Sequence, residues 1–131
     1  MANQMPAHGT FCWNELMTRD TEKAGKFYQE LIGWSMISES MSESPYFTFK
    51  TGEKMNSGMM PMPPDVPDQV PSHWMAYITV DDVDATTARV ADLGGTVLHG
   101  PQDIPKVGRF SIIQDPTGAT IGLIKLSAPE K

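Results

Sequence analysis

The sequence repeats a set of structural signals at a constant spacing, and this repeat limits the fold more than any other feature. Asp20 and Asp82 each end a short stretch with β character, and they lie 62 positions apart (82 − 20 = 62). Gly33 and Gly95 are separated by the same interval. Asp favours the position before a helix and Gly the position after it. A strand, a helix start and a helix end therefore recur in one register, which predicts an internal duplication.

Each repeat predicts the order β-α-β-β-β. Apolar residues recur at helical spacing between the capping Asp and the Gly, so we expect helices over Thr21–Ile32 and Val83–Leu93. Three stretches with strand character follow each helix. These expected strands are Trp34–Ser38, Tyr46–Lys50 and about Met55–Met60 in the first repeat, and Thr96–His99, Arg109–Gln114 and Ala119–Leu126 in the second.

A proline-rich stretch separates the two repeats. Residues 61–71 contain five prolines, which exclude regular helix and central strand and favour a semi-rigid surface linker. We therefore expect one domain over residues 1–131, with a first module at about 10–60 and a second at about 73–126. The predicted class is α+β. Two tandem β-α-β-β-β modules form a curved sheet or half-barrel, with helices outside and a central cleft.

Composition and charge exclude several classes of protein. A chain of 131 residues, 40% of them hydrophobic, is long enough to bury one core. The net charge of −6 argues against a nucleic-acid partner. No apolar run reaches the roughly 18–20 residues of a membrane span, and the N-terminus lacks secretory features, so we expect a cytoplasmic protein without a membrane partner. Cys12 is the single cysteine, and we expect a buried structural thiol.

Three segments carry a resemblance to a known family. They are Asp20 through Phe27-Tyr28 to Gly33-Trp34, Val80–Ala85 leading to Leu93-Gly94-Gly95, and Asp115–Ala119. Along nearly its full length the chain resembles the vicinal oxygen chelate superfamily of glyoxalases, bleomycin resistance proteins and extradiol dioxygenases. The resemblance implies this fold, a small-molecule ligand in the cleft and a homodimer. It does not fix an activity, because one scaffold hosts many chemistries.

The resemblance also implies a metal site that can be tested position by position. In the superfamily each module supplies two inward side chains, usually His, Gln or Glu, to a divalent metal. The matching positions here are Trp13 and Met75 on the first strands, and Gly122 with its repeat mate Met60 on the last strands. Indole and glycine offer no donor, and a thioether suits only soft metals. We therefore expect no bound metal and no other cofactor.

Strand alternation indicates which other side chains share the inner face. Trp13, Glu15 and Met17 should lie on one face, and Met75 and Tyr77 on the matching face of the second module. Such a face is apolar and aromatic and carries one carboxylate, which suits a small organic ligand. Glu15 and Tyr77 are the candidate catalytic residues. An orientation of Glu15 toward solvent at a strand edge remains an alternative.

Arg109 and Phe110 follow a loop that contains Pro and Gly, and we include both among the candidate ligand-binding residues. The guanidinium of Arg109 is suited to holding a ligand carboxylate or phosphate. Pairing of Arg109 with a local acid, Asp103 or Asp115, is an equal alternative.

Four functions follow from these residues. The favoured one is a superfamily protein of resistance or sensor type, which binds a small organic molecule in the cleft without a metal and has no assigned activity. The second is a lyase, isomerase or hydroxylase-like enzyme that uses Glu15 as base, with Tyr77 or Arg109 as electrophile. The third, a metal-dependent glyoxalase-type lyase, conflicts with the four inferred ligand positions. The fourth is a purely structural or interaction domain.

Overall fold

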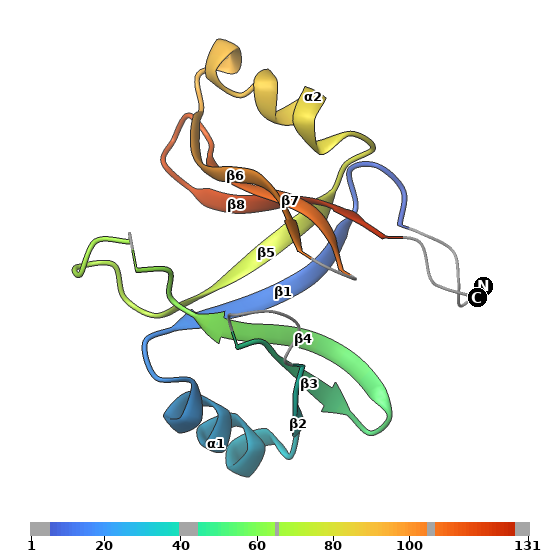
Figure 1. The fold of residues 1–131 in the computed structure, drawn as a ribbon, viewed down its shortest axis with the longest axis vertical. Coiled ribbons are helices and arrows are strands. Elements are labelled where there is room, and N and C mark those ends of the chain that lie inside the picture. Colours follow the sequence, from blue (N-terminus) through green and yellow to red (C-terminus); the bar gives the residue numbers. More distant parts are fainter. Residues whose placement is uncertain (1–5, 40–44, 65, 105–106, 128–131) are drawn as a thin grey trace. The chain divides into compact units, whose positions relative to one another are not determined.

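The structure is a computed structural model, and it describes residues 6–39, 45–64, 66–104 and 107–127. Its internal contacts divide the chain into two compact units. One unit is Trp13–Met75, and the other comprises Ala76–Lys131 together with the N-terminal segment that ends at Cys12. We call the repeat over residues 11–61 the first module and the repeat over residues 73–126 the second module. Both modules have the predicted β-α-β-β-β order, which confirms the α+β class (Figure 1).

The first-module strands follow the order β2-β3-β4-β1. Its elements are β1 (Phe11–Thr18), α1 (Thr21–Ile32), β2 (Ser35–Ser38), β3 (Phe47–Thr51) and β4 (Lys54–Pro61). β1 pairs with β4 in parallel, whereas β2–β3 and β3–β4 are antiparallel. Parallel strands cannot be joined by a tight turn. The chain therefore passes through α1, β2 and β3 before β4 pairs with β1.

The second module repeats this pattern as β5-β8-β7-β6. Its elements are β5 (His73–Thr79), α2 (Val83–Ala88), a 3₁₀ turn (Ala91–Leu93), β6 (Thr96–Ile104), β7 (Gly108–Gln114) and β8 (Thr120–Leu126). β5 pairs with β8 in parallel, and the remaining pairs are antiparallel.

The N-caps of both helices and the C-cap of α1 are those the sequence predicts, whereas α2 ends at Arg89 and not at Gly94-Gly95. The Asp20 side chain accepts a hydrogen bond from the Lys23 amide, and Gly33 ends α1 in the left-handed region at φ 90°. Asp82 caps α2 in the same way. The predicted second helix is wrong beyond Ala88, where the α-helix gives way to the 3₁₀ turn. The β-branched Thr86 and Thr87 reduce helix propensity there.

Each helix covers one face of its own strands (Figure 1). In the first module Leu16 and Met59 are buried together with Phe49, and Ala24 and Tyr28 of α1 pack against them. In the second module the corresponding cluster is Val80, Val83 and Leu123. We call the opposite face of each set of strands the far face. Because side chains alternate along a strand, the neighbours of Leu16 and Leu123 project to the far faces.

Strand β6 is longer than predicted and changes the spacing between the repeats. It runs through Gly100-Pro101, which the sequence marks as a turn, to Ile104. The pairing of β6 with β7 shifts register between His99 and Gln102. A bulge of this kind accommodates a proline that cannot donate to the ladder.

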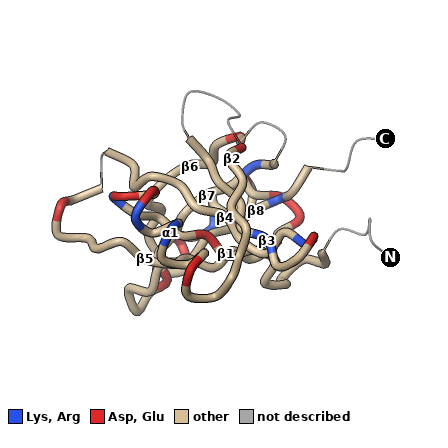
Figure 2. The backbone as a smooth tube through the Cα atoms, turned by 90° about the horizontal axis from the view of Figure 1, so that it is seen from below, with Lys and Arg blue, Asp and Glu red and all other residues tan. Residues whose placement is uncertain are grey.

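Acidic and basic positions are interspersed along the backbone of both modules (Figure 2). Among the described residues, neither α-helix is long and apolar enough to cross a bilayer.

Candidate functional site

The far face of the first module brings predicted site residues together. Glu15 pairs with Gly58 across β1 and β4, and Met17 pairs with Met60 two residues further on. Glu15 and Met17 are each 3% exposed, whereas Trp13 and Met60 are half-buried. The expected alternation is therefore seen, and the solvent-facing alternative for Glu15 is excluded by its burial.

A chain of two hydrogen bonds joins three side chains on this face. Trp13 Nε1 donates to the hydroxyl of Tyr46 at 3.2 Å. Tyr46 Oη donates in turn to Glu15 Oε2 at 2.7 Å. Tyr46 lies immediately before β3, so the chain links the first strand of the module to its third. We call Trp13, Tyr46 and Glu15 the hydrogen-bond chain.

Burial and negative charge keep Tyr46 protonated. Burial raises the pKa of the Tyr46 phenol far above its ordinary value, and the charge of Glu15 and its hydrogen bond add to this effect. A smaller contribution comes from the carboxylate of Glu39. Glu39 Oε2 accepts a hydrogen bond of 2.9 Å from Thr48 Oγ1. The phenol is thus a hydrogen-bond donor throughout the neutral pH range.

Gly58 provides the space that the Tyr46 hydroxyl occupies. A Cβ atom added at Gly58 would collide with Tyr46 Oη and would lie 3.3 Å from Trp13 Nε1. The second module contains the same device, because a Cβ at Gly122 would collide with the ring of Tyr77. In each module a tyrosine thus lies over a glycine of the last strand.

The strand registers correct one predicted equivalence. Gly122 pairs with Tyr77, and Gly58 pairs with Glu15, the repeat mate of Tyr77. The structural mate of Gly122 is therefore Gly58, at an interval of 64 (122 − 58 = 64), and the predicted mate Met60 is wrong. The interval grows from 62 to 64 after the helices, where the repeats differ in length around β6.

The far face of the second module is less polar. Tyr77 and Phe110 are 2% and 6% exposed, and their rings meet edge to face at 6.4 Å between centroids. Phe110 takes the place that Tyr46 has in the first module, at the same interval of 64. The ring of His99 lies 5.5 Å from Phe110. Met75 is buried on β5 at 3% exposure.

The residues at the inferred metal positions do not fit a divalent ion. Gly58 and Gly122 offer no side-chain donor, and tyrosine atoms fill the space into which a donor would project. Trp13 and Met75 offer an indole and a thioether. No group of three or more His, Cys, Asp or Glu side chains with metal-binding geometry occurs within the described part of the chain.

Arg109 is held by two acids of the second module. It forms a bidentate pair with Asp84 at 2.9 Å through Nε and Nη2, and a further bond of 3.0 Å to Asp103. The pair with Asp103 confirms the structural alternative, whereas pairing with Asp115 is wrong. Asp115 instead accepts hydrogen bonds from Thr117 and Ala119 within its own turn. Hydrogen bonds from Arg109 hold the pKa of Asp84 below its ordinary value.

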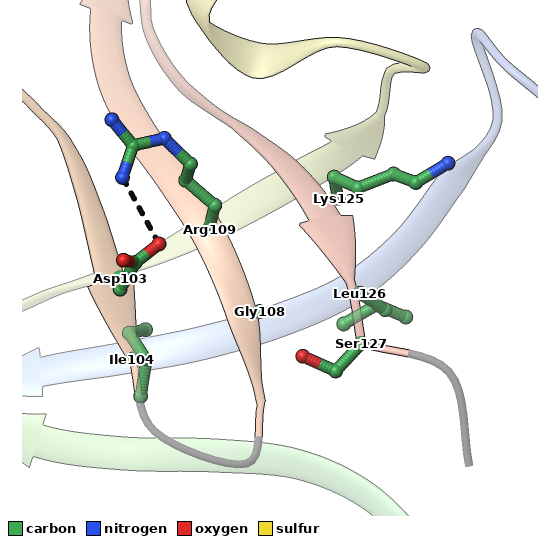
Figure 3. A pocket seen from close by; sticks show the side chains of 7 residues that line it. All are labelled: Asp103, Ile104, Gly108, Arg109, Lys125, Leu126 and Ser127. Carbon is green, nitrogen blue, oxygen red and sulfur yellow. Dashed lines mark hydrogen bonds and ion pairs between the residues drawn. The ribbon is translucent and has the colours of Figure 1, made fainter.

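An open hollow of about 400 Å³ lies beside Arg109 at the ends of β6, β7 and β8. Figure 3 shows the side chains of Arg109 and Lys125 extending in different directions, with Arg109 joined to Asp103. The guanidinium of Arg109 beside this hollow is already paired with the carboxylates of Asp84 and Asp103. The lining residues are Asp103, Ile104, Gly108, Arg109, Lys125, Leu126 and Ser127.

The sequence analysis missed Tyr46, Gly58 and Glu39. At an interval of 62, Tyr46 aligns with Gly108, which gives no sign of an inward side chain. At the interval of 64 it aligns with Phe110, a candidate site residue. An alignment of the two repeats at the interval of 64 would therefore have indicated Tyr46 as a candidate site residue.

Comparison of the sequence with family models and with curated proteins finds clear matches. The family model described as Glyoxalase/Bleomycin resistance protein/Dioxygenase superfamily matches residues 10–123. The chain is 41% identical over 126 residues to "Putative glyoxylase CFP32" of Mycobacterium tuberculosis (strain CDC 1551 / Oshkosh), covering 94% of this chain and 46% of that protein. It is 30% identical over 129 residues to "Anthracycline biosynthesis protein DnrV" of Streptomyces peucetius, covering 89% and 47%. The chain thus spans about half the length of these curated relatives.

Solved structures share the fold. A methylmalonyl-CoA epimerase from Mycobacterium tuberculosis superposes with a TM-score of 0.61 at 16% identity, covering 97% of this chain and 96% of the epimerase. A variant of homoprotocatechuate 2,3-dioxygenase from B. fuscum gives 0.61 at 18% identity, covering 94% and 34%. At these identities the likeness concerns the fold alone.

Proposed function

The chain belongs to the Glyoxalase/Bleomycin resistance protein/Dioxygenase superfamily, and from that premise we propose that it binds a small organic molecule without a metal. The ligand lies on the far face of the first module, against Trp13, Met17 and Met60. The observation that carries the proposal is the hydrogen bond between Tyr46 and the buried carboxylate of Glu15.

The surroundings of Glu15 support a binding role. A carboxylate that is 3% exposed needs hydrogen bonds to offset its lost hydration, and Tyr46 supplies one of them. The half-buried indole of Trp13 and thioether of Met60 adjoin this polar group. An apolar surface with a few fixed polar groups is the usual composition of a small-molecule site.

A catalytic role for the same residues is the second candidate. Glu15 and Tyr46 lie 2.7 Å apart, which is a suitable distance for a base and a proton donor to act together. Tyr46 fits the donor role better than Tyr77, which is 2% exposed and lies over Gly122. Arg109 is a poor electrophile because two carboxylates already pair with it. A lyase or isomerase activity is the form that this candidate takes, in keeping with the glyoxylase name of CFP32.

The equivalent positions of the second module are apolar. Met75, Tyr77 and Phe110 stand where the first module has Trp13, Glu15 and Tyr46, and they bear no charge. The ligand-binding role predicted for Met75 and Phe110 and the catalytic role predicted for Tyr77 stay predictions. We also propose that the chain forms a homodimer, as its resemblance to the superfamily implies.

A thermal-shift screen tests the binding function, because a ligand of the folded state raises Tm. The screen compares divalent metals with small aromatic and acidic metabolites. We expect organic compounds to raise Tm and Trp13→Ala or Glu15→Gln to abolish the rise. Glu22→Gln on the exposed face of α1 is the matched control. Stabilisation that both site variants retain would place the ligand elsewhere and contradict the proposal.

A further inference from the structure

Helix α1 leaves large apolar side chains exposed on its outer side. Phe27 and Leu31 lie four positions apart, so they are neighbours on the helix surface. They are 55% and 65% exposed. The opposite side of α1 faces the strands of the first module, and Gly25 is buried there (Figure 1). Apolar side chains that adjoin one another in water are typical of an interaction surface.

Aromatic contacts hold this exposed group in place. The ring of Phe27 meets that of Tyr28 edge to face at 5.1 Å between centroids, and Trp74 meets Tyr28 at 5.5 Å. Trp74 belongs to the same compact unit as α1, is 39% exposed and donates from Nε1 to the Tyr28 hydroxyl at 3.0 Å. Tyr28 itself packs against the core of the first module. The exposed rings are thus ordered before a partner binds, which lowers the entropy cost of association. We call Phe27, Leu31 and Trp74 the α1 surface.

Two side chains of opposite charge border the α1 surface. Lys23 and Glu30 are exposed and lie about 20° apart around the helix axis, beside Phe27. Neither side chain forms an ion pair or a hydrogen bond within the described part of the chain. Lys23 lies near the start of α1 and Glu30 near its end. In an antiparallel pair of identical helices, the same border of each helix meets in reverse order. Lys23 of one copy would therefore lie beside Glu30 of the other, and the pair would occur twice.

We infer that the α1 surface is the contact between two copies of this chain, which pack with their α1 helices antiparallel about a twofold axis near Phe27. The inference rests on the proposed homodimer and gives it an interface. The two Phe27 rings pack against each other, Leu31 and Trp74 extend the apolar contact, and two pairs of Lys23 with Glu30 flank it. A surface whose charges complement themselves on reversal fits a second copy, whereas a border of one sign would fit a partner of opposite charge.

Charge reversal tests this pairing, with the Kd of the dimer measured by sedimentation equilibrium. Lys23→Glu sets acids against acids across the interface, and Glu30→Lys sets bases against bases, so each should raise Kd by roughly tenfold or more. The double variant exchanges the signs and should dimerise like the wild type. An equimolar mixture of the two single variants should form a heterodimer, because the acids of one chain then meet the bases of the other. Glu22→Lys makes the same charge change on another side of α1 and is the control.

The outcomes distinguish this inference from the homodimer on which it rests. A dimer whose Kd is unchanged by both reversals and by Phe27→Ala would overturn the α1 surface as the interface and leave the homodimer intact. Single reversals that weaken the dimer without recovery in the mixture would contradict the antiparallel pairing. A wild-type monomer at roughly tens of micromolar would overturn the homodimer as well. An acid near the start of a helix and a base near its end suit the helix dipole, so both reversals should remain folded, which circular dichroism checks.

Discussion

The hydroxyl of Tyr46 lies 2.7 Å from Glu15 Oε2 and fills the space above Gly58. A glycine on the last strand, a tyrosine over it and a buried acid beside it form one unit of three residues. In the second module Tyr77 lies above Gly122, and Tyr77 itself stands at the position equivalent to Glu15. The two modules thus share a strand arrangement but carry side chains of different polarity at equivalent positions, Glu15 in the first and Tyr77 in the second.

The Tyr46–Glu15 bond should contribute to stability. Tyr46→Phe leaves a buried carboxylate without one of its donors, so we expect the free energy of unfolding to fall by about 1–3 kcal/mol. Urea denaturation at neutral pH measures the change. Tyr28→Phe removes a hydroxyl that bonds to exposed Trp74, and it should cost less than about 1 kcal/mol. Equal effects of the two variants would contradict a specific role for the bond.

Gly58 should be coupled to Tyr46. Gly58→Ala inserts a methyl group where Tyr46 Oη lies, and we expect a loss of about 1–3 kcal/mol from overpacking. In a Tyr46→Leu background the same substitution should cost less, because the colliding hydroxyl is gone. A double-mutant cycle gives the interaction energy. Additive effects would show that the two positions do not share this space.

The ion pair of Arg109 should make stability depend on pH. A carboxyl whose pKa is lower in the folded state adds stability that is complete above its ordinary value, 3.8 for Asp84, and is lost as pH falls through the lower folded value. Asp84→Asn should therefore lower Tm at pH 7, and the difference from wild type should shrink below pH 3.8. The exposed Asp92→Asn is the control. A difference that persists unchanged at pH 2, on the order of two units lower, would exclude this origin.

The proposed homodimer predicts the mass of the particle in solution. Sedimentation equilibrium at tens of micromolar, an order-of-magnitude choice for weak interfaces, should give twice the chain mass of 14.4 kDa. A monomer throughout this concentration range would refute the dimer.

The features predicted correctly from the sequence are those that depend on neighbouring residues in the chain. The capping Asp20, the apolar spacing and Gly33 define α1 from Thr21 to Ile32, as the structure has it. Alternation along β1 orients Glu15 and Trp13 correctly, because a strand has only two faces.

Tertiary pairing determines the rest. The equivalence of Gly58 and Gly122 depends on the length of β6 and on its bulge near Gly100-Pro101, which local patterns do not predict. Tyr46 lies 31 residues from its partner Glu15, and no local pattern joins them. Asp84 of α2 likewise pairs with Arg109 of β7, and no local pattern in the sequence joins them. Long-range side-chain contacts of this kind are set by the fold.

Metal content measured alongside ligand binding tests the central claim most directly. Protein purified without chelator is submitted to elemental analysis, and the rise in Tm caused by an organic compound that the thermal-shift screen identifies is then measured with and without EDTA. Retaining a divalent ion takes about three or four protein donors, which Trp13, Met75, Gly58 and Gly122 do not provide. The account predicts a metal content far below one ion per chain and an identical rise in Tm in EDTA. A stoichiometric metal whose removal by EDTA abolishes the rise would contradict it.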